Sequence, residues 1–166
     1  MPRGALVISG VDMKDNTIDV QLIIRTDRTQ YKSSCSEIRI KESDTGIMVP
    51  GCLLEACVDA GNGTYILFTT DDTLFEEALY ISHVDLHKKS TLDSMTMFVP
   101  YATGIFKMLA VQKDSIVFQF ISEIPWKLSI TRKPTFFTGR LYKEIKRRIK
   151  MRSTLKIRKR LPSPLK

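Results

Sequence analysis

The chain has 166 residues, 43% of them hydrophobic and 27% charged, with a formal net charge of +8. This length and composition suit one globular domain with a core and an appendage, and the basic balance predicts a polyanionic partner. No apolar run approaches the roughly 20 residues that span a membrane, and the first residues lack the apolar length of a secretory signal.

Four strands are predicted in the first third of the chain. Residues 5–11 and 18–26 are rich in β-branched side chains, and the second run becomes continuously apolar towards its end. Residues 37–42 alternate between isoleucine and polar side chains, which is typical of a short strand with one exposed face. Residues 47–50 begin a further strand that a Pro-Gly pair interrupts.

The middle of the chain mixes the two kinds of element. Residues 52–61 are interpreted as one or two helical turns, with a buried strand as the alternative. Residues 64–70 predict a strand, and Asn62-Gly63 predicts the turn before it. A short helix is predicted over residues 73–81, and a strand over residues 79–86 is its rival.

Strand signals dominate the rest of the body. Residues 95–99 and 126–131 each predict a strand, and the runs 104–112 and 115–122 are joined by a two-residue polar link, which predicts a β-hairpin. Strands therefore outnumber helices, without the strand–helix alternation of a parallel sheet. We expect a strand-dominated α+β fold, with a small twisted antiparallel sheet or partly open sandwich, one or two packed helices, and a basic C-terminal helix.

The basic charge lies at the C-terminal end. Residues 131–166 hold fourteen of the 26 lysines and arginines and one of the 18 acidic residues, so this segment has a formal charge of +13 and the residues before it sum to −5. We therefore expect a β-rich globular core over residues 1–131 and a basic tail over residues 132–166.

The tail carries a helical pattern. Leu141, Ile145 and Ile149 recur four residues apart and are surrounded by lysine and arginine. This spacing predicts an amphipathic helix over about residues 139–152.

Three functions fit a basic amphipathic tail. It can bind a phosphate backbone by releasing counterions, adsorb to an anionic bilayer, or act as a nuclear import signal through the clusters Lys146–Arg148 and Arg158–Arg160. A solvated helix docked on the body is the alternative without a binding function. The predicted polyanion-binding residues are Arg132, Lys133, Arg140, Lys143, Lys146, Arg147, Arg148, Lys150, Arg152, Lys156, Arg158, Lys159 and Arg160.

Aromatic side chains flank the start of the tail. Phe136, Phe137 and Trp126 lie among basic residues, where they can stack on bases, enter a membrane interface or pin the tail to the body. We favour the last of these roles.

The cysteines and histidines suggest a metal site only weakly. Cys52 and Cys57 are spaced Cys-x4-Cys, and His83 and His87 are spaced His-x3-His, but the gap between the pairs is twice that of a compact zinc finger. The odd total of three cysteines predicts a reducing compartment and ordinary core cysteines.

No catalytic motif stands out. The pairs Asp71-Asp72 and Glu76-Glu77 suit the cap and first turn of a helix better than a divalent cation site. The sequence contains no Gly-x-Ser-x-Gly motif and no glycine-rich phosphate loop. We expect a non-enzymatic protein without a cofactor or metal.

Two segments resemble the matrix proteins of rhabdoviruses. Residues 18–38 have a strand ending in an arginine, a polar segment with a second arginine, and an aromatic residue before a serine-rich stretch. Residues 97–120 have a Val-Pro pair, then a glycine followed by an aromatic residue and a lysine, and a strongly β-forming hairpin. The chain's size and basicity also resemble the short matrix proteins of plant-infecting members, although those proteins usually carry their basic segment at the N-terminus.

The resemblance implies a small twisted sheet packed against helices, self-association, and a bridge between nucleocapsid and membrane during virion assembly. We therefore expect a viral structural protein that binds ribonucleoprotein, nucleic acid or an anionic membrane surface through its tail. The expected locations are the virion and the host cytoplasm or inner membrane face, with the nucleus added if the basic clusters direct import. The alternative is a nucleic-acid-binding viral accessory protein of the movement or silencing-suppressor type.

Overall fold

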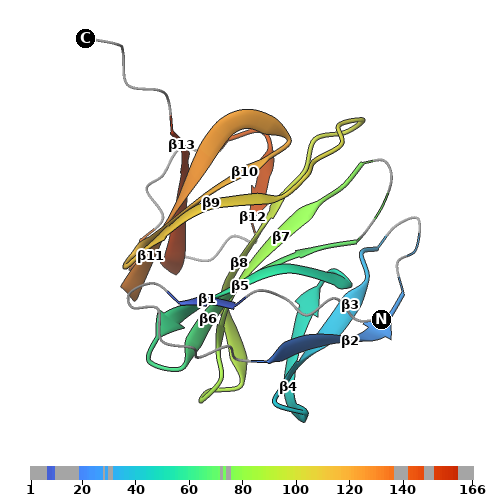
Figure 1. Cartoon of the computed structure of the whole chain (residues 1–166), viewed down its shortest axis with the longest axis vertical. Helices are drawn as coiled ribbons and strands as arrows, with labels where there is room; N and C mark the ends of the chain where they lie inside the picture. Colours follow the sequence, from blue (N-terminus) through green and yellow to red (C-terminus); the bar gives the residue numbers. More distant parts are fainter. Residues whose placement is uncertain are drawn as a thin grey trace.

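In the part of the chain that it describes, the computed structural model is all-β and built from three sheets (Figure 1). It describes residues 7–9, 19–27, 29, 32–71, 73, 76–136, 142–147 and 152–160. Within these residues the strands are β1 (Val7–Ser9), β2 (Val20–Thr26), β3 (Cys35–Ile40), β4 (Ser43–Pro50), β5 (Leu53–Gly61), β6 (Thr64–Thr70), β7 (Leu79–Asp85), β8 (Ser90–Met97), β9 (Lys107–Gln112), β10 (Ser115–Phe120), β11 (Ser122–Phe136), β12 (Ile145–Arg147) and β13 (Arg152–Lys159).

A six-stranded sheet forms the central layer, with the strand order β1-β5-β6-β7-β8-β12. Its strands β5 to β8 follow one another as antiparallel neighbours, while β1 adds to β5 in parallel. The other two sheets are antiparallel, with the orders β13-β11-β10-β9 and β2-β3-β4.

The main core lies between the six-stranded and the four-stranded sheet. Phe68 and Phe118 meet across this interface edge to face, with ring centroids 5.2 Å apart. A smaller core lies on the opposite face of the six-stranded sheet, where Leu67 and Val84 pack with Ile38 and Val49 of the three-stranded sheet. The central sheet is therefore covered on both faces.

Two-sided burial explains the continuous apolar runs of the central strands. Every described side chain of β7 is buried, and so is every one in β6 except Thr64. Alternate residues point to opposite faces of a sheet, so a strand between two cores needs apolar side chains at odd and even positions alike.

Two predicted turns are confirmed. Asn62 and Gly63 both have positive φ, 55° and 72°, as a tight turn that follows the right-handed twist of its strands requires, and they join β5 to β6. Lys113 and Asp114 join β9 to β10 as the predicted hairpin.

Gly51 marks the point where the chain leaves one sheet for the next. It has φ +93°, and a Cβ there would lie 2.9 Å from side-chain atoms of Thr69 and from the carbonyl oxygen of Thr70. The predicted break after residue 50 is therefore confirmed, because only glycine combines this backbone with such close approach.

The predicted helices in the body are wrong, and with them the α+β class. Residues 52–61 contain β5, which is the strand alternative, and the predicted helix over 73–81 runs into β7, which begins at Leu79. Short apolar runs do not distinguish a buried strand from a buried helix, and here the two-sided central sheet decides for the strand. Asp72, Leu74 and Phe75 lie outside the described residues.

The predicted C-terminal helix over residues 139–152 is also wrong. Ile145 begins strand β12 and pairs with Met97 at the edge of the six-stranded sheet. Arg152 begins β13, which pairs with β11 of the four-stranded sheet. Leu141 and Ile149, the other members of the predicted stripe, lie outside the described residues. No helix long enough and apolar enough to cross a membrane occurs in the described part of the chain.

The tail contributes a strand to each of the two sheets that enclose the main core. Strand β11 runs through the expected boundary at residue 131, and Leu155 of β13 is fully buried among the core residues. Trp126 stacks edge to face on Tyr142 with ring centroids 5.3 Å apart, so it does contact the tail as expected.

A buried carboxylate joins the tail to the central sheet. Asp93 of β8 is 1% exposed, and its Oδ2 accepts hydrogen bonds from the backbone N–H groups of Thr154 at 2.9 Å and Leu155 at 3.0 Å. The same oxygen accepts the Ser153 hydroxyl at 2.8 Å and the guanidinium of Arg147. Four donors from β12 and β13 thus converge on one oxygen of β8.

Candidate polyanion-binding face

The outer face of the four-stranded sheet is basic. Along β11, Trp126 and Leu128 point into the core, so Lys127 between them points outward. Along β13, Leu155 and Ile157 contact the core, so Arg158 points outward in the same way. Register pairing sets Lys127 directly opposite Arg158.

The basic face is extended along β13. Lys156, Arg158 and Arg160 are all exposed and follow one another at every second residue, about 7 Å apart for an extended strand. The N–H of Arg160 donates to the carbonyl oxygen of Pro125 at 2.7 Å, which continues the pairing past the end of the strand. The three cations therefore form a row on a rigid backbone, and we call Lys127, Lys156, Arg158 and Arg160 the basic face.

The charges of this face are not neutralised within the described part of the chain. Lys127, Arg158 and Arg160 have no acidic side chain there within ion-pair distance. Like charges directly opposite each other on neighbouring strands repel and destabilise a sheet. A bound anion between them would remove that repulsion.

A shallow pocket of about 320 Å³ lies within the basic face. Val117 of β10, which is 3% exposed, belongs to its lining, and Gln112 of β9 adds an amide at its edge. The full lining is Gln112, Val117, Lys127, Arg158, Lys159 and Arg160, without an acidic residue. The guanidinium, ammonium and amide donors of this lining suit a phosphate or carboxylate group.

Lys159, which belongs to the lining of this pocket, also makes contacts that stabilise the fold. Its ammonium bonds to Glu144 at 2.8 Å and lies 5.2 Å from the ring centroid of Trp126 and 5.7 Å from that of Tyr142. The hydrogen bond from Lys159 lowers the pKa of Glu144. Lys159 therefore contributes charge to the pocket from a side chain that is already paired.

The predicted binding residues fall into different environments. Lys133, Lys143, Lys146, Lys156, Arg158 and Arg160 are exposed. Arg147 is different, since its side chain is 7% exposed and holds Asp93. Arg132 and Arg152 lie in β11 and β13, but their side chains are outside the described set. Arg140, Arg148 and Lys150 lie outside the described residues altogether.

Sequence reasoning missed Lys127 and Gln112. The alternation in residues 126–131 already places Lys127 on the face opposite Trp126 and Leu128. What the sequence lacked was the pairing of β11 with β13, which brings Lys127 to Arg158 across a separation of thirty-one residues.

Three of the candidate metal or catalytic residues, Cys57, Asp71 and Glu77, serve the fold. Cys57 is fully buried, and burial raises the pKa of its thiol to about 12. Asp71 accepts hydrogen bonds from Ser34 and, at 2.7 Å, from the Tyr80 hydroxyl, while Glu77 accepts the N–H of Asp71 at 3.0 Å. Among the described residues, no three histidine, cysteine or acidic side chains are grouped so that they could hold a metal ion.

Comparison with models of protein families, with curated proteins and with solved structures finds no match to this chain.

Proposed function

We propose that this protein is a non-enzymatic structural protein of the viral matrix type, and that its basic face binds the phosphate groups of RNA in a ribonucleoprotein. The observation that carries the proposal is the cross-strand pair Lys127–Arg158, which is flanked by Lys156 and Arg160 and has no acidic partner in the described structure.

The geometry favours a flexible nucleic-acid strand as the partner. The row of cations on β13 repeats about every 7 Å, a spacing that an extended single strand can follow with successive phosphates. Pairing with β11 fixes the backbone that carries the row, so binding has to order the cationic side chains but not the strand itself. Recognition of this kind is largely blind to sequence and strongly dependent on salt.

The matrix assignment rests on the resemblance of residues 18–38 and 97–120 to rhabdovirus matrix proteins. It entails self-association, contact with an anionic membrane surface, and a location in the virion and at the inner membrane face. A second candidate uses the same basic face, namely a viral accessory protein that binds nucleic acid and stays small. Measuring the oligomeric state separates the two.

The test compares the full chain with the double variant Lys127→Gln/Arg158→Gln. Binding to a single-stranded RNA of mixed sequence is measured by fluorescence anisotropy over a range of salt concentrations. Loss of two phosphate contacts lowers the slope of log affinity against log salt by about 1.4. The matched control, Lys32→Gln/Lys41→Gln, removes the same charge from exposed positions beside the three-stranded sheet and should leave the slope unchanged.

Liposomes rich in phosphatidylserine form the second arm of this test. Binding to RNA that depends on Lys127 and Arg158 supports the proposal. Binding to liposomes alone, lost in the same variant, would replace RNA with a membrane as the partner of this face. Equal RNA binding by the two double variants would show that the basic face is not the site.

A further inference from the structure

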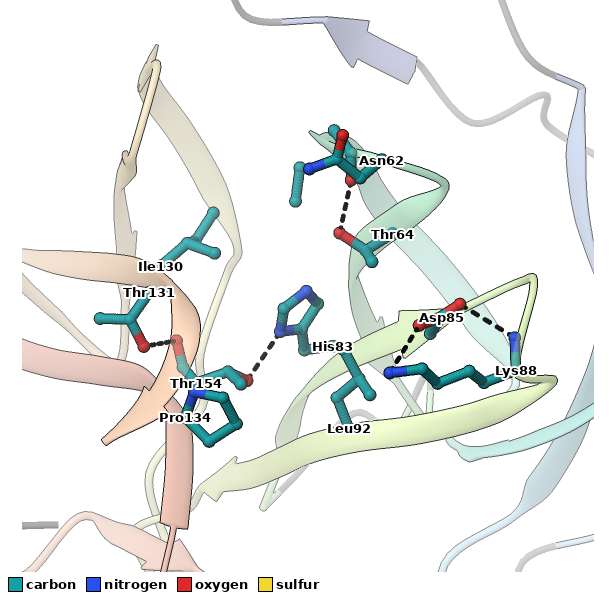
Figure 2. Close-up of a pocket in the computed structure, with 12 residues that line it drawn as sticks. Asn62, Thr64, His83, Asp85, Lys88, Leu92, Ile130, Thr131, Pro134 and Thr154 are labelled. Carbon is teal, nitrogen blue, oxygen red and sulfur yellow. Dashed lines mark hydrogen bonds and ion pairs between the residues drawn. The ribbon is translucent and has the colours of Figure 1, made fainter. Parts of the chain in front are cut away.

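A second cavity lies at one end of the main core, between the two sheets. Its volume is about 410 Å³, within the range of small-molecule sites. One wall comes from the central sheet, at the β5–β6 turn and at β7 and β8, and the other from β11 and β13 (Figure 2). The register of β11 on β13 shifts between Ile130 and Thr135, so the strand pairing is interrupted beside the cavity.

A buried histidine lines this cavity. His83 is 4% exposed, and its Nδ1 lies 2.7 Å from the hydroxyl oxygen of Thr154. Its Nε2 is buried without a hydrogen-bond partner in the described structure. Figure 2 shows this second nitrogen on the side of the ring away from Thr154, facing the space between Ile130 and Asn62.

The proton on the ring can be placed. Burial lowers the pKa of His83, so the imidazole is neutral at neutral pH even though Asp93 and Asp85 act in the opposite direction. The only hydrogen-bond partner of the buried Thr154 hydroxyl in the described structure is Nδ1 of His83. We assign the proton to Nε2, because in that tautomer the Thr154 hydroxyl donates to Nδ1, whereas the reverse arrangement would leave the hydroxyl proton without an acceptor in the described structure.

The formal charges of the described cavity lining sum to zero. Asp85 and Lys88 are the only ionised side chains of its described lining, and they approach each other to 3.7 Å. The backbone N–H groups of Lys88 and His87 also donate to Asp85 and lower its pKa. Leu92, Ile130 and Pro134 supply apolar surface.

We propose that this cavity binds a small neutral molecule that accepts a hydrogen bond from His83 Nε2 through a carbonyl-type oxygen and packs an apolar body against Leu92, Ile130 and Pro134. The described lining has no net formal charge with which an ionic ligand could pair. This site is separate from the basic face and does not depend on the function proposed for it.

The first test uses the full chain and cyclohexanone, a neutral probe that only accepts hydrogen bonds. Long-range ¹H–¹⁵N spectra of the histidine rings report the tautomer of His83 and its contact with the probe. We expect the proton on Nε2 and a saturable shift of that nitrogen, and no such shift with cyclohexylammonium. Absence of a saturable shift would refute the site, and binding of cyclohexanol without cyclohexanone would refute the acceptor class of ligand.

Two variants locate the probe. His83→Phe should weaken cyclohexanone binding about tenfold, the effect of one lost hydrogen bond. Leu92→Phe fills part of the cavity without changing His83, so it should reduce binding while the tautomer signal persists. Leu109→Phe, at an exposed position of β9, is the matched control. Equal binding by the Leu92 and Leu109 variants would place the probe elsewhere and overturn the proposal.

Discussion

Removing the carboxylate of Asp93 should lower the free energy of unfolding by far more than the loss of one small side chain suggests. Asp93→Ala leaves the guanidinium of Arg147, which is 7% exposed, without its buried counter-charge. Breaking a buried ion pair from one side costs about 3–5 kcal/mol. The backbone N–H groups of Thr154 and Leu155 also lose their acceptor. We therefore expect a loss near the upper end of this range, about 5 kcal/mol, out of the 5–15 kcal/mol typical of a domain.

Urea unfolding measures this loss, with the single tryptophan as the reporter. Trp126 is 2% exposed and packs on Tyr142, so its fluorescence changes when the tail leaves the core. The matched control, Asp114→Ala, removes an exposed carboxylate from the β9–β10 turn and should shift the free energy of unfolding by less than about 0.5 kcal/mol.

The same mechanism predicts a partial rescue. In the double variant Asp93→Ala/Arg147→Met no buried cation remains unpaired, so it should be more stable than Asp93→Ala alone. A loss below about 1 kcal/mol for Asp93→Ala, or the absence of rescue, would contradict the reading of Asp93 as the residue that holds the tail in the fold.

Two further predictions concern the pH dependence and the sheet switch. Burial places the pKa of His83 below its ordinary value of 6.5, against the opposing charges of Asp93 and Asp85, so the unfolded chain takes up this proton first. At pH values above about 6.5, His83 should therefore not affect the free energy of unfolding. As the pH drops below about 6.5 through the folded-state pKa, the free energy of unfolding should fall. His83→Gln should flatten that fall, as measured by urea titrations at a series of pH values. Gly51→Ala should lower the free energy of unfolding by more than about 2 kcal/mol, because the new Cβ would make contacts at 2.9 Å at a position that already has a positive φ. The control Gly46→Ala also has a positive φ but no atom within 4 Å of the new Cβ, so it should lose only about 1–2 kcal/mol. Equal melting temperatures for the two variants would refute the steric argument.

Local chemistry determined the turns and many of the strands. Asn62-Gly63 predicts its turn because these residues tolerate positive φ, and the strand over residues 64–70 follows from its β-branched and aromatic side chains. The β9–β10 hairpin is equally local, since two apolar runs with a two-residue link have few other ways to fold. The concentration of basic charge in the last part of the chain is also a property of the sequence alone.

Tertiary structure decided the elements whose local signals were ambiguous. Residues 53–61 form a strand because the six-stranded sheet has a core on each face, with Ala56 and Val58 on one side and Cys57 on the other. An apolar side chain at Ile145 suits both the predicted helical stripe and a strand position beside Met97. The strand forms because β8 offers an edge with which residues 145–147 can pair.

The candidate site divides in the same way. The sequence showed that the tail is basic, but only the pairing of β11 with β13 turned Arg158 outward opposite Lys127 and left Lys159 against Trp126. Arg147 lies in the same basic run, but its side chain is buried and has a structural role, because it forms an ion pair with Asp93 of β8. Charge is fixed residue by residue along a chain, whereas the face that each charge occupies depends on contacts between strands far apart in the sequence.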